Sequence, residues 1–217
     1  MNRIRTLTFP WVNAYLVPVK DGFILIDSGF ALNRGKLMKG LQEEGCRPGN
    51  LNLIVVTHGD ADHSGNAAYL RATYGAPIAM HAAEVEAVRR GNLFLSREPL
   101  LRGRRLLKPL MSLFGPRRRN RFTPDVLLQD GDRLEPYGLA ATILHVPGHS
   151  AGSIGVLVDD GTFFSGDFLE NRKKPSLATL LYDEDALRRS FRRVKALKID
   201  RVYPGHGGTF TMDEIQN

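Results

Sequence analysis

The sequence predicts a mixed α/β fold, and three observations support this class. The chain opens on three short apolar segments, two of them joined by a Lys20-Asp21-Gly22 turn, a pattern typical of antiparallel strands. Short β-branched runs then alternate with segments whose apolar residues recur at helical spacing. This alternation occurs twice within 217 residues. Two successive halves, each with strands followed by a helix, indicate mixed sheets with helices packed outside.

The first half is expected to contain five strands and three helices. The expected strands are residues 4–9, 12–19, 22–27, 53–57 and 77–81. The expected helices are residues 31–44, about 63–75 and 82–90. Leu32, Leu37 and Leu41 share one face of the first helix, which predicts that this face points inward. A glycine follows each helix, as helix C-termini favour.

The second half is expected to contain six strands and one helix. The expected strands are residues 126–128, 133–135, 139–146, 152–158, 162–165 and 201–203. Asp159-Asp160-Gly161 is a strong signal for a hairpin turn between two of them. The helix is expected at about 184–197. Its apolar face carries Leu187, Phe191, Val194 and Leu197. The four arginines at 188, 189, 192 and 193 are expected to form its solvated face.

The net charge of +7 originates in one segment of the chain. Residues 97–121 hold nine basic side chains against Glu98 alone, and three prolines divide the segment into short pieces. We expect one domain over residues 1–217, with this basic segment inserted at about 92–122 as a helical arm or lid. Such an arm could cover a substrate or contact an anionic surface. The alternative is a solvated basic face above ordinary core leucines.

Other sequence features limit the class of protein. Cys46 is the one cysteine, so no internal disulfide can form. No apolar run approaches 18 residues, which predicts no membrane span. The N-terminus lacks the continuous apolar core of a signal peptide. A cytoplasmic protein is therefore expected. Binding of nucleic acid is not favoured, because the basic segment has few stacking aromatics and no recognisable motif.

One short stretch concentrates the chemistry. Residues 57–66 place His58, Asp60, Asp62 and His63 directly after a buried strand. Imidazole nitrogens and carboxylate oxygens are metal ligands, and a loop at a strand end can direct them at one point. A chance cluster of polar residues on a solvated loop is the alternative if this stretch is considered alone.

Three later strands end in the same way. His149, Asp167 and His206 each follow a short apolar strand, and each has a glycine immediately before it. Glycine lets the backbone turn tightly and approach a bound ion closely. Four histidines and three aspartates at the ends of buried strands suit a site for two metal ions.

The order HxDxDH, PGH, SGD and PGH resembles the metallo-β-lactamase-fold hydrolase superfamily. Residues 12–17 and 24–29 extend the resemblance, which covers nearly the whole chain apart from 92–122. The resemblance implies a four-layer αββα sandwich of two mixed sheets, with the site at one edge of both sheets. Asp60 departs from the family pattern HxHxDH, which has a histidine there.

The resemblance also implies a set of metal ligands. His58, His149 and residue 60 would bind one ion. Asp62, His63 and His206 would bind the second, and Asp167 would bridge the two. Asp60 could supply an oxygen ligand, or it could turn away and leave the first site depleted. Two divalent ions are expected. Zinc is the leading choice, and manganese or iron are alternatives because Asp60 is a harder ligand than histidine.

Three further residues have less defined expectations. Asp27 would either support a ligand loop by hydrogen bonding or form a plain turn. His145 is expected to be a packed strand histidine, and His81 could approach the site from outside the ligand set.

The predicted function is a metal-dependent hydrolase in which an activated hydroxide attacks an ester, thioester or lactone. Asp62 is the expected catalytic residue, because the resemblance places it beside the bridging water. The substrate is expected to be a small anionic molecule. Formation of a homodimer is left as an open alternative.

Two other functions stay open. His58, His149 and Asp167 form a two-histidine, one-carboxylate set that would suit a mononuclear Fe(II) dioxygenase acting on persulfides. A protein without catalytic activity, binding nucleic acid or an anionic surface through the basic segment, is the remaining alternative.

Overall fold

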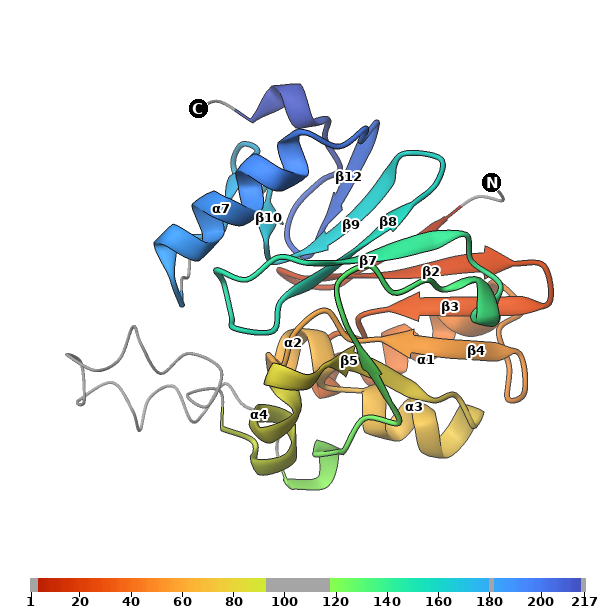
Figure 1. The fold of residues 1–217 in the computed structure, drawn as a ribbon. Coiled ribbons are helices and arrows are strands. Elements are labelled where there is room, and N and C mark those ends of the chain that lie inside the picture. The colour runs from red at the N-terminus through yellow and green to blue at the C-terminus, as the bar shows by residue number, and fades with distance from the viewer. Residues whose placement is uncertain (1–3, 93–117, 180–181, 216–217) are drawn as a thin grey trace.

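A computed structural model describes residues 4–92, 118–179 and 182–215. They form the four-layer αββα sandwich that the sequence predicted (Figure 1). Two sheets lie face to face, and helices cover the outer face of each. Most of the predicted arm at 92–122 lies outside the described residues, so its helical character stays a prediction. No helix in the described ranges is long and apolar enough to cross a membrane.

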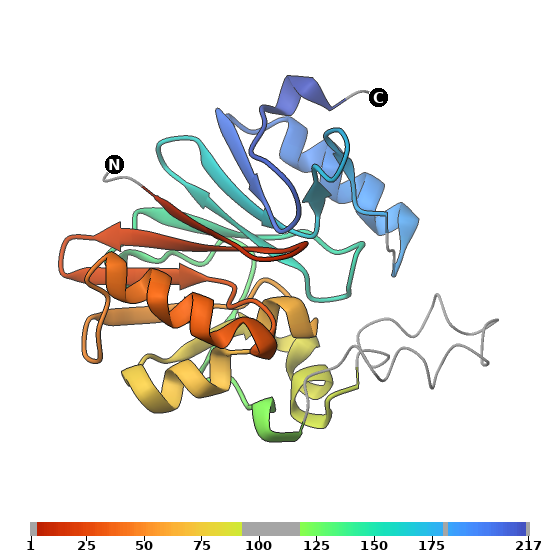
Figure 2. The ribbon, with the colours of Figure 1, turned by 180° about the vertical axis from the view of Figure 1, so that it is seen from behind.

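The first sheet contains six strands in chain order: β1 (Arg5–Thr8), β2 (Asn13–Val19), β3 (Gly22–Ile26), β4 (Leu51–Val55), β5 (Ile78–His81) and β6 (Val126–Leu128). The first three strands pair antiparallel, and the pairs from β3 to β6 are parallel. The parallel pairs require crossovers, which the helices supply. Figure 2 shows α1 (Arg34–Glu43) and α3 (Ala67–Tyr74) over the outer face of this sheet.

The second sheet has the strand order β12-β9-β8-β7. Its strands are β7 (Ala141–His145), β8 (Ile154–Val158), β9 (Thr162–Gly166) and β12 (Arg201–Pro204). β12 pairs parallel with β9, and the other pairs are antiparallel. α7 (Glu184–Lys195) covers its outer face (Figure 1). A small separate pair, β10 (Leu169–Glu170) with β11 (Ser176–Leu177), follows β9.

Apolar side chains fill the three spaces between the four layers. Strand alternation explains how one strand serves two of these spaces. In β3, Leu25 packs under the helices of the first sheet, whereas Ile24 and Ile26 face the second sheet. Leu187 and Val194 of α7 pack on the far side of the second sheet. The two sheets are therefore held together by a shared core, which fixes their strand ends relative to each other.

The predicted strand at 133–135 is wrong. Arg133 forms an isolated bridge to Thr142, and Glu135–Tyr137 is a 3-10 turn, η7. Pro136 lies within that turn, and Gly138 follows it with φ 94°. Proline cannot donate to a strand ladder, and the left-handed glycine turns the chain back toward β7.

The predicted helices begin less regularly than expected. Residues Ala31–Asn33 form a 3-10 turn, η1, before α1. This turn puts Leu32 out of phase with the helix, so Leu32 is 83% exposed and not inward as predicted. The segment after His58 divides into α2 (Ala61–Ser64) and α3, and η2 (Ala82–Glu84) precedes α4 (Val85–Arg90). Two more 3-10 turns are η6 (Arg118–Asn120) and η8 (Met212–Glu214).

Candidate metal centre

The predicted ligands follow strands of both sheets, and their ligand atoms lie close together. The first ligand loop follows β4 and leads into α2. His149 lies in the loop between β7 and β8, Asp167 directly follows β9, and His206 follows β12. Ile154 N donates to Thr57 O at 3.0 Å, which joins the first ligand loop to the second sheet. The site is therefore assembled across the contact between the two sheets.

His58, Asp60 and His149 form a first triad whose ligand atoms lie within 4.8 Å of one another. Asp60 Oδ2 is 3.6 Å from His58 Nε2 and 3.4 Å from His149 Nε2. The carboxylate of Asp60 thus points into the site. This orientation is consistent with the first of the two alternatives, and that Asp60 binds a metal stays a prediction.

Asp62, His63 and His206 form a second triad of the same compactness. Asp62 Oδ2 lies 3.7 Å from His63 Nε2 and 3.5 Å from His206 Nε2. Each triad presents imidazole nitrogens and a carboxylate oxygen at one point. Such donor sets suit zinc, manganese or iron.

Asp167 lies between the two triads. Its Oδ1 is 3.1 Å from His63 Nε2, and its Oδ2 is 3.0 Å from His206 Nε2 in the second triad. The same Oδ2 lies 3.8 Å from His149 Nε2 and 4.0 Å from His58 Nε2 in the first. One carboxylate with an oxygen near both groups is the arrangement that a bridging ligand requires.

Hydrogen bonds at the Nδ1 atom orient three of the histidine rings. His63 Nδ1 donates to Asp27 Oδ2 at 2.8 Å, and His206 Nδ1 donates to the backbone carbonyl of Trp11. Thr57 Oγ1 lies 3.1 Å from His58 Nδ1. Because the Thr57 hydroxyl donates its one hydrogen to Asp27, His58 Nδ1 is the donor in the contact with Thr57. In these three rings the Nδ1 is engaged, and the Nε2 is directed into the site.

Asp27 is therefore a supporting residue of the ligand loop and not a plain turn residue. Its carboxylate also accepts the backbone N–H of Thr57 at 2.8 Å. Asp27 has φ 58°, in the left-handed region that few residues other than glycine adopt. The hydrogen bonds to Thr57 and His63 hold the residue in this conformation.

The electrostatics of the site couple the histidines to the carboxylates. Burial by itself lowers the pKa of His63, but the charges of Asp167, Asp27 and Asp62 raise it well above its ordinary value. The pKa of His206 is likewise raised by Asp167 against the effect of burial. Burial raises the pKa of Asp167, but His63 and His206 lower it well below the ordinary range. The carboxylate of Asp167 thus presents negative charge that favours a cation.

The residues present fit divalent metal ions. Among the described residues, the buried atoms His58 Nε2, His63 Nε2 and Asp167 Oδ1 make no hydrogen bond, although His63 and Asp167 are in ion-pair contact. Buried polar atoms are normally hydrogen-bonded, and an exception requires an explanation. Bound metal ions would supply that explanation, because these atoms belong to the groups whose ligand atoms lie within 4.8 Å of one another.

The site is more open on its carboxylate side. The side chains of the four histidines are 0–3% exposed. The side chains of Asp60 and Asp167 are 12% and 10% exposed, and that of Asp62 is 20% exposed. Asp62 is therefore the most accessible of the seven side chains.

The structure brings all seven predicted residues together. His81 and His145 lie outside the set, stacked on each other with ring centroids 4.2 Å apart. Sequence analysis missed Glu84, a fully buried carboxylate hydrogen-bonded to two loops of the site. Its only local signal is an acidic residue at the start of a helix, which is common on surfaces.

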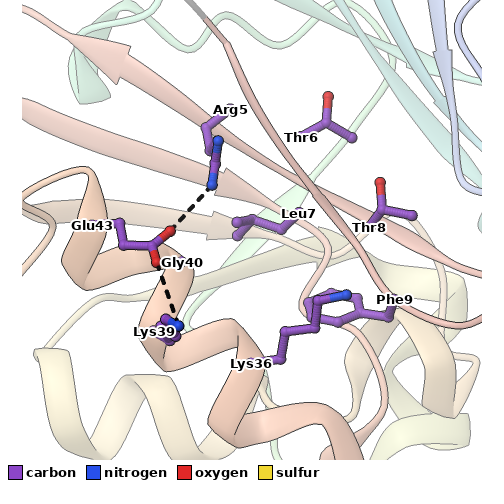
Figure 3. A pocket seen from close by; sticks show the side chains of 9 residues that line it. All are labelled: Arg5, Thr6, Leu7, Thr8, Phe9, Lys36, Lys39, Gly40 and Glu43. Carbon is purple, nitrogen blue, oxygen red and sulfur yellow. Dashed lines mark hydrogen bonds and ion pairs between the residues drawn. The ribbon is translucent and has the colours of Figure 1, made fainter.

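A separate groove of about 260 Å³ lies between β1 and α1 (Figure 3). It shares no residue with the site. Two of its three cations pair with one carboxylate: Arg5 lies 3.2 Å from Glu43, and Lys39 lies 4.0 Å from it. The third, Lys36, lies 5.9 Å from the centroid of the Phe9 ring. The paired charges give this groove no clear ligand.

Comparison with known proteins decides the family. The family model described as the metallo-beta-lactamase superfamily matches residues 9–206. The chain belongs to the metallo-β-lactamase superfamily. The matched residues include both triads and Asp167.

Individual relatives within this superfamily are distant. The chain is 28% identical over 220 residues to an acyl-coenzyme A thioesterase, MBLAC2 of Bos taurus, with 94% of this chain and 75% of the relative covered. It is 28% identical to TTHA1623 in a di-iron-bound form, with a TM-score of 0.73 and coverage of 97% and 95%. A Cronobacter sakazakii metallo-β-lactamase with a HARLDQ motif is 23% identical, with a TM-score of 0.72 and coverage of 94% and 75%, and shows the fold alone.

The superfamily and its thioesterase relatives support a metal-dependent hydrolase acting on a small molecule. The clusters of histidine and aspartate are consistent with binding of divalent metal. The bond that is cleaved and the identity of the metal are matters for a proposal.

Proposed function

We propose that this protein is a dinuclear metal-dependent hydrolase of acyl thioesters. The observation that carries the proposal is the pair of His/Asp triads on either side of Asp167. Its Oδ1 lies near His63 of the second triad, and its Oδ2 lies near His206 of the second triad and His149 of the first. One carboxylate near both triads allows two ions to lie close enough to act on one reacting centre.

The residues of the site would have distinct roles. His58, Asp60 and His149 would hold one ion, Asp62, His63 and His206 the other, and Asp167 would bridge them. Ions bound there would supply Lewis acidity, which polarises a carbonyl and lowers the pKa of water from about 15.7 toward about 7. Asp62 is the most exposed carboxylate, so it would orient the attacking water and accept its proton.

A thioester of an anionic carrier is the substrate class that we favour. Two relatives that are 28% and 27% identical to this chain are acyl-coenzyme A thioesterases by name. The chain itself carries a net charge of +7, which attracts an anionic substrate over distances of about 10 Å at moderate salt. Esters and lactones are the alternative substrates, because the same attack on a carbonyl would cleave them.

Zinc remains the metal that we expect. Iron and manganese are the alternatives, because Asp60 supplies oxygen in place of nitrogen. The di-iron-bound form of TTHA1623 also favours iron.

The mononuclear dioxygenase is the rival on the same residues. It would use His58, His149 and Asp167 and leave Asp62, His63 and His206 without a role. The close second triad favours the dinuclear reading. A persulfide assay with measurement of oxygen consumption tests the rival directly.

Counting metals tests the dinuclear centre. The wild-type protein, prepared without chelator, should contain close to two ions per chain by mass spectrometry. His206→Ala should lose the ion of the second triad, and Asp60→Ala that of the first. One ion per chain, unaffected by either substitution, would contradict the proposal.

A substrate panel tests the bond. Acyl-coenzyme A, the matching acyl-pantetheine and a matching oxygen ester separate the effect of the thioester from that of the charged carrier. We expect kcat/KM to be highest for acyl-coenzyme A and to fall for the uncharged carrier. Metal-loaded protein that cleaves the ester or a lactone but no thioester would exclude the thioesterase.

A further inference from the structure

Glu84 is a fully buried carboxylate that the proposed chemistry does not use. It is the last residue of η2. Its Oε2 accepts the backbone N–H of Gly59 at 2.9 Å, and its Oε1 accepts that of Gly152 at 2.9 Å. Removing a carboxylate from water is costly unless charge-assisted hydrogen bonds compensate, and these two do so.

The two hydrogen bonds reach the two loops that carry the first triad. Gly59 lies between His58 and Asp60 in the loop after β4. Gly152 lies three residues after His149, in the loop between β7 and β8. These loops come from different sheets, so one side chain links the two halves of the triad across the sandwich.

The packing around Glu84 leaves room for glycine alone. A Cβ added at Gly59 would lie 2.9 Å from Glu84 Oε2. A Cβ added at Gly152 would lie 2.7 Å from Glu84 Cγ and 3.0 Å from Oε1. Both backbones therefore approach the Glu84 side chain closely.

We propose that Glu84 is a positioning residue that sets the spacing of His58, Asp60 and His149 and thereby the metal affinity of the first triad. The inference rests on the dinuclear centre proposed above. It goes beyond that proposal because it assigns a role to a residue that would touch neither metal nor substrate. The second triad has its own supports, since Asp27 holds His63 and the Trp11 carbonyl holds His206.

Glu84→Gln tests the role with little change in volume. The amide oxygen can accept one of the two N–H groups, but the amide NH₂ then faces the other donor. Metal affinity is measured by competition with a chromophoric chelator, using Zn²⁺ and metal-depleted protein. Two backgrounds separate the triads: His206→Ala disables the second triad, and His149→Ala disables the first.

We expect Glu84→Gln to weaken Zn²⁺ binding about 10–100-fold in the His206→Ala background, as loss of an outer hydrogen bond to a metal site does. In the His149→Ala background the affinity should change less than about threefold. Equal loss in both backgrounds would indicate a general structural role and overturn the inference. Unchanged affinity in both would overturn it as well.

Two further variants complete the test. Ser28→Ala is the matched control, because Ser28 Oγ donates to His63 O at 2.8 Å and so supports the second triad. It should show the opposite selectivity. Gly152→Ala keeps the carboxylate but displaces it, so it should reproduce the effect of Glu84→Gln. It also carries the test, with the same outcomes, if circular dichroism shows that Glu84→Gln does not fold.

Failure of the proposed centre is distinguishable from failure of this inference. Wild-type protein that binds fewer than two Zn²⁺ ions would contradict the dinuclear centre, whatever Glu84 does. Wild-type protein that binds two ions, with a folded Glu84→Gln of unchanged affinity, would contradict the inference alone.

Discussion

At the scale of single residues, Asp60 distinguishes the first triad from the second. Its carboxylate occupies the position where the family pattern has a histidine, and it lies 3.4 Å from His149 Nε2. With Asp62 and Asp167 it gives the site three carboxylates. If Asp60 binds the first ion as we propose, its oxygen in place of a histidine nitrogen would make this ligand set harder, which would favour manganese or iron more than a histidine would.

Asp27 supports both triads. Its substitution should therefore weaken metal binding at both, whereas substitution of Glu84 should weaken binding at the first triad alone. It accepts from His63 Nδ1 directly, and it holds Thr57, which contacts His58. Asp27→Asn should therefore weaken both metal-binding steps, each by about 10–100-fold. Asparagine tolerates φ 58°, so the loop should keep its conformation. Chelator competition in the His206→Ala and His149→Ala backgrounds measures the two steps, and loss confined to one would contradict the prediction.

Cys46 should be unreactive while the protein is folded. The residue is 1% exposed, and burial raises the pKa of its thiol to about 12. The thiolate is the reactive form, so an aromatic disulfide reagent at pH 8 should modify native protein at least about tenfold more slowly than urea-unfolded protein. Because the folded-state pKa is raised, stabilisation by the neutral thiol should be lost as the pH rises from about 9 toward 12. Equal rates of modification in both states would contradict burial of the thiol.

At the scale of elements, the strand ends were predictable and some of their neighbours were not. An apolar run that stops at glycine and a ligand is a local signal, so His149, Asp167 and His206 could be placed from sequence. The strand expected at 133–135 failed because alternation of Leu134 with charged residues also fits a 3-10 turn next to Pro136. Leu32 failed because periodicity does not show that a 3-10 turn precedes α1.

Glu84 shows why part of the candidate site was hidden in the sequence. Its two hydrogen-bond partners, Gly59 and Gly152, lie 25 and 68 residues away. A glutamate at the start of a helix is usually a solvated residue near the positive end of the dipole. Only the contact between the two sheets brings both loops to it, and no local pattern encodes that contact.

The loop that carries His149 depends on contact with α7. A Cβ added at Gly148 would lie 2.5 Å from Leu187 Cβ and 2.6 Å from Leu187 Cα, and Gly148 has φ 149°. Gly148→Ala should therefore lower the free energy of unfolding by about 1–3 kcal/mol through overpacking, in addition to backbone strain. It should also weaken metal binding, because His149 is the next residue.

Gly75→Ala is the matched control for that substitution. Gly75 has φ 73°, but an added Cβ would meet no atom within 4 Å. The cost should then be backbone strain alone, about 1–2 kcal/mol, with metal affinity unchanged. Urea unfolding of the two variants measures the difference. Equal losses would show that contact with α7 does not constrain the His149 loop.

At the scale of the whole molecule, the site exists because the two sheets are tied together at their ends. Asn13 N donates to Gly205 O at 2.8 Å, and Asn13 Nδ2 donates to Gly207 O at 2.8 Å. β2 of the first sheet therefore holds the loop of His206 after β12. That residues 1–217 form one domain remains a prediction, but the shared core between the sheets is consistent with it.

Tyr15 makes a direct side-chain hydrogen bond between the sheets, and its loss should cost stability without pH dependence. The buried hydroxyl donates to Pro204 O at 2.5 Å. Tyr15→Phe should lower the free energy of unfolding by about 1 kcal/mol, the net value of one such bond. Pro204 O keeps a second donor, Asn13 Nδ2 at 3.2 Å, so no acceptor is left unsatisfied.

The pH dependence follows from the state of the hydroxyl. Burial raises the pKa of Tyr15 far above its ordinary value, so in the folded protein the group stays a neutral donor from pH 6 to pH 9. An unfolded chain also keeps tyrosine neutral over most of this range, because its ordinary pKa is near 10. Urea unfolding of both proteins at pH 6 and pH 9 should therefore give the same difference. A difference that disappears at pH 9 would show that the hydroxyl ionises in the folded state, and the two sheets would then be held by the Asn13 bonds and the shared core.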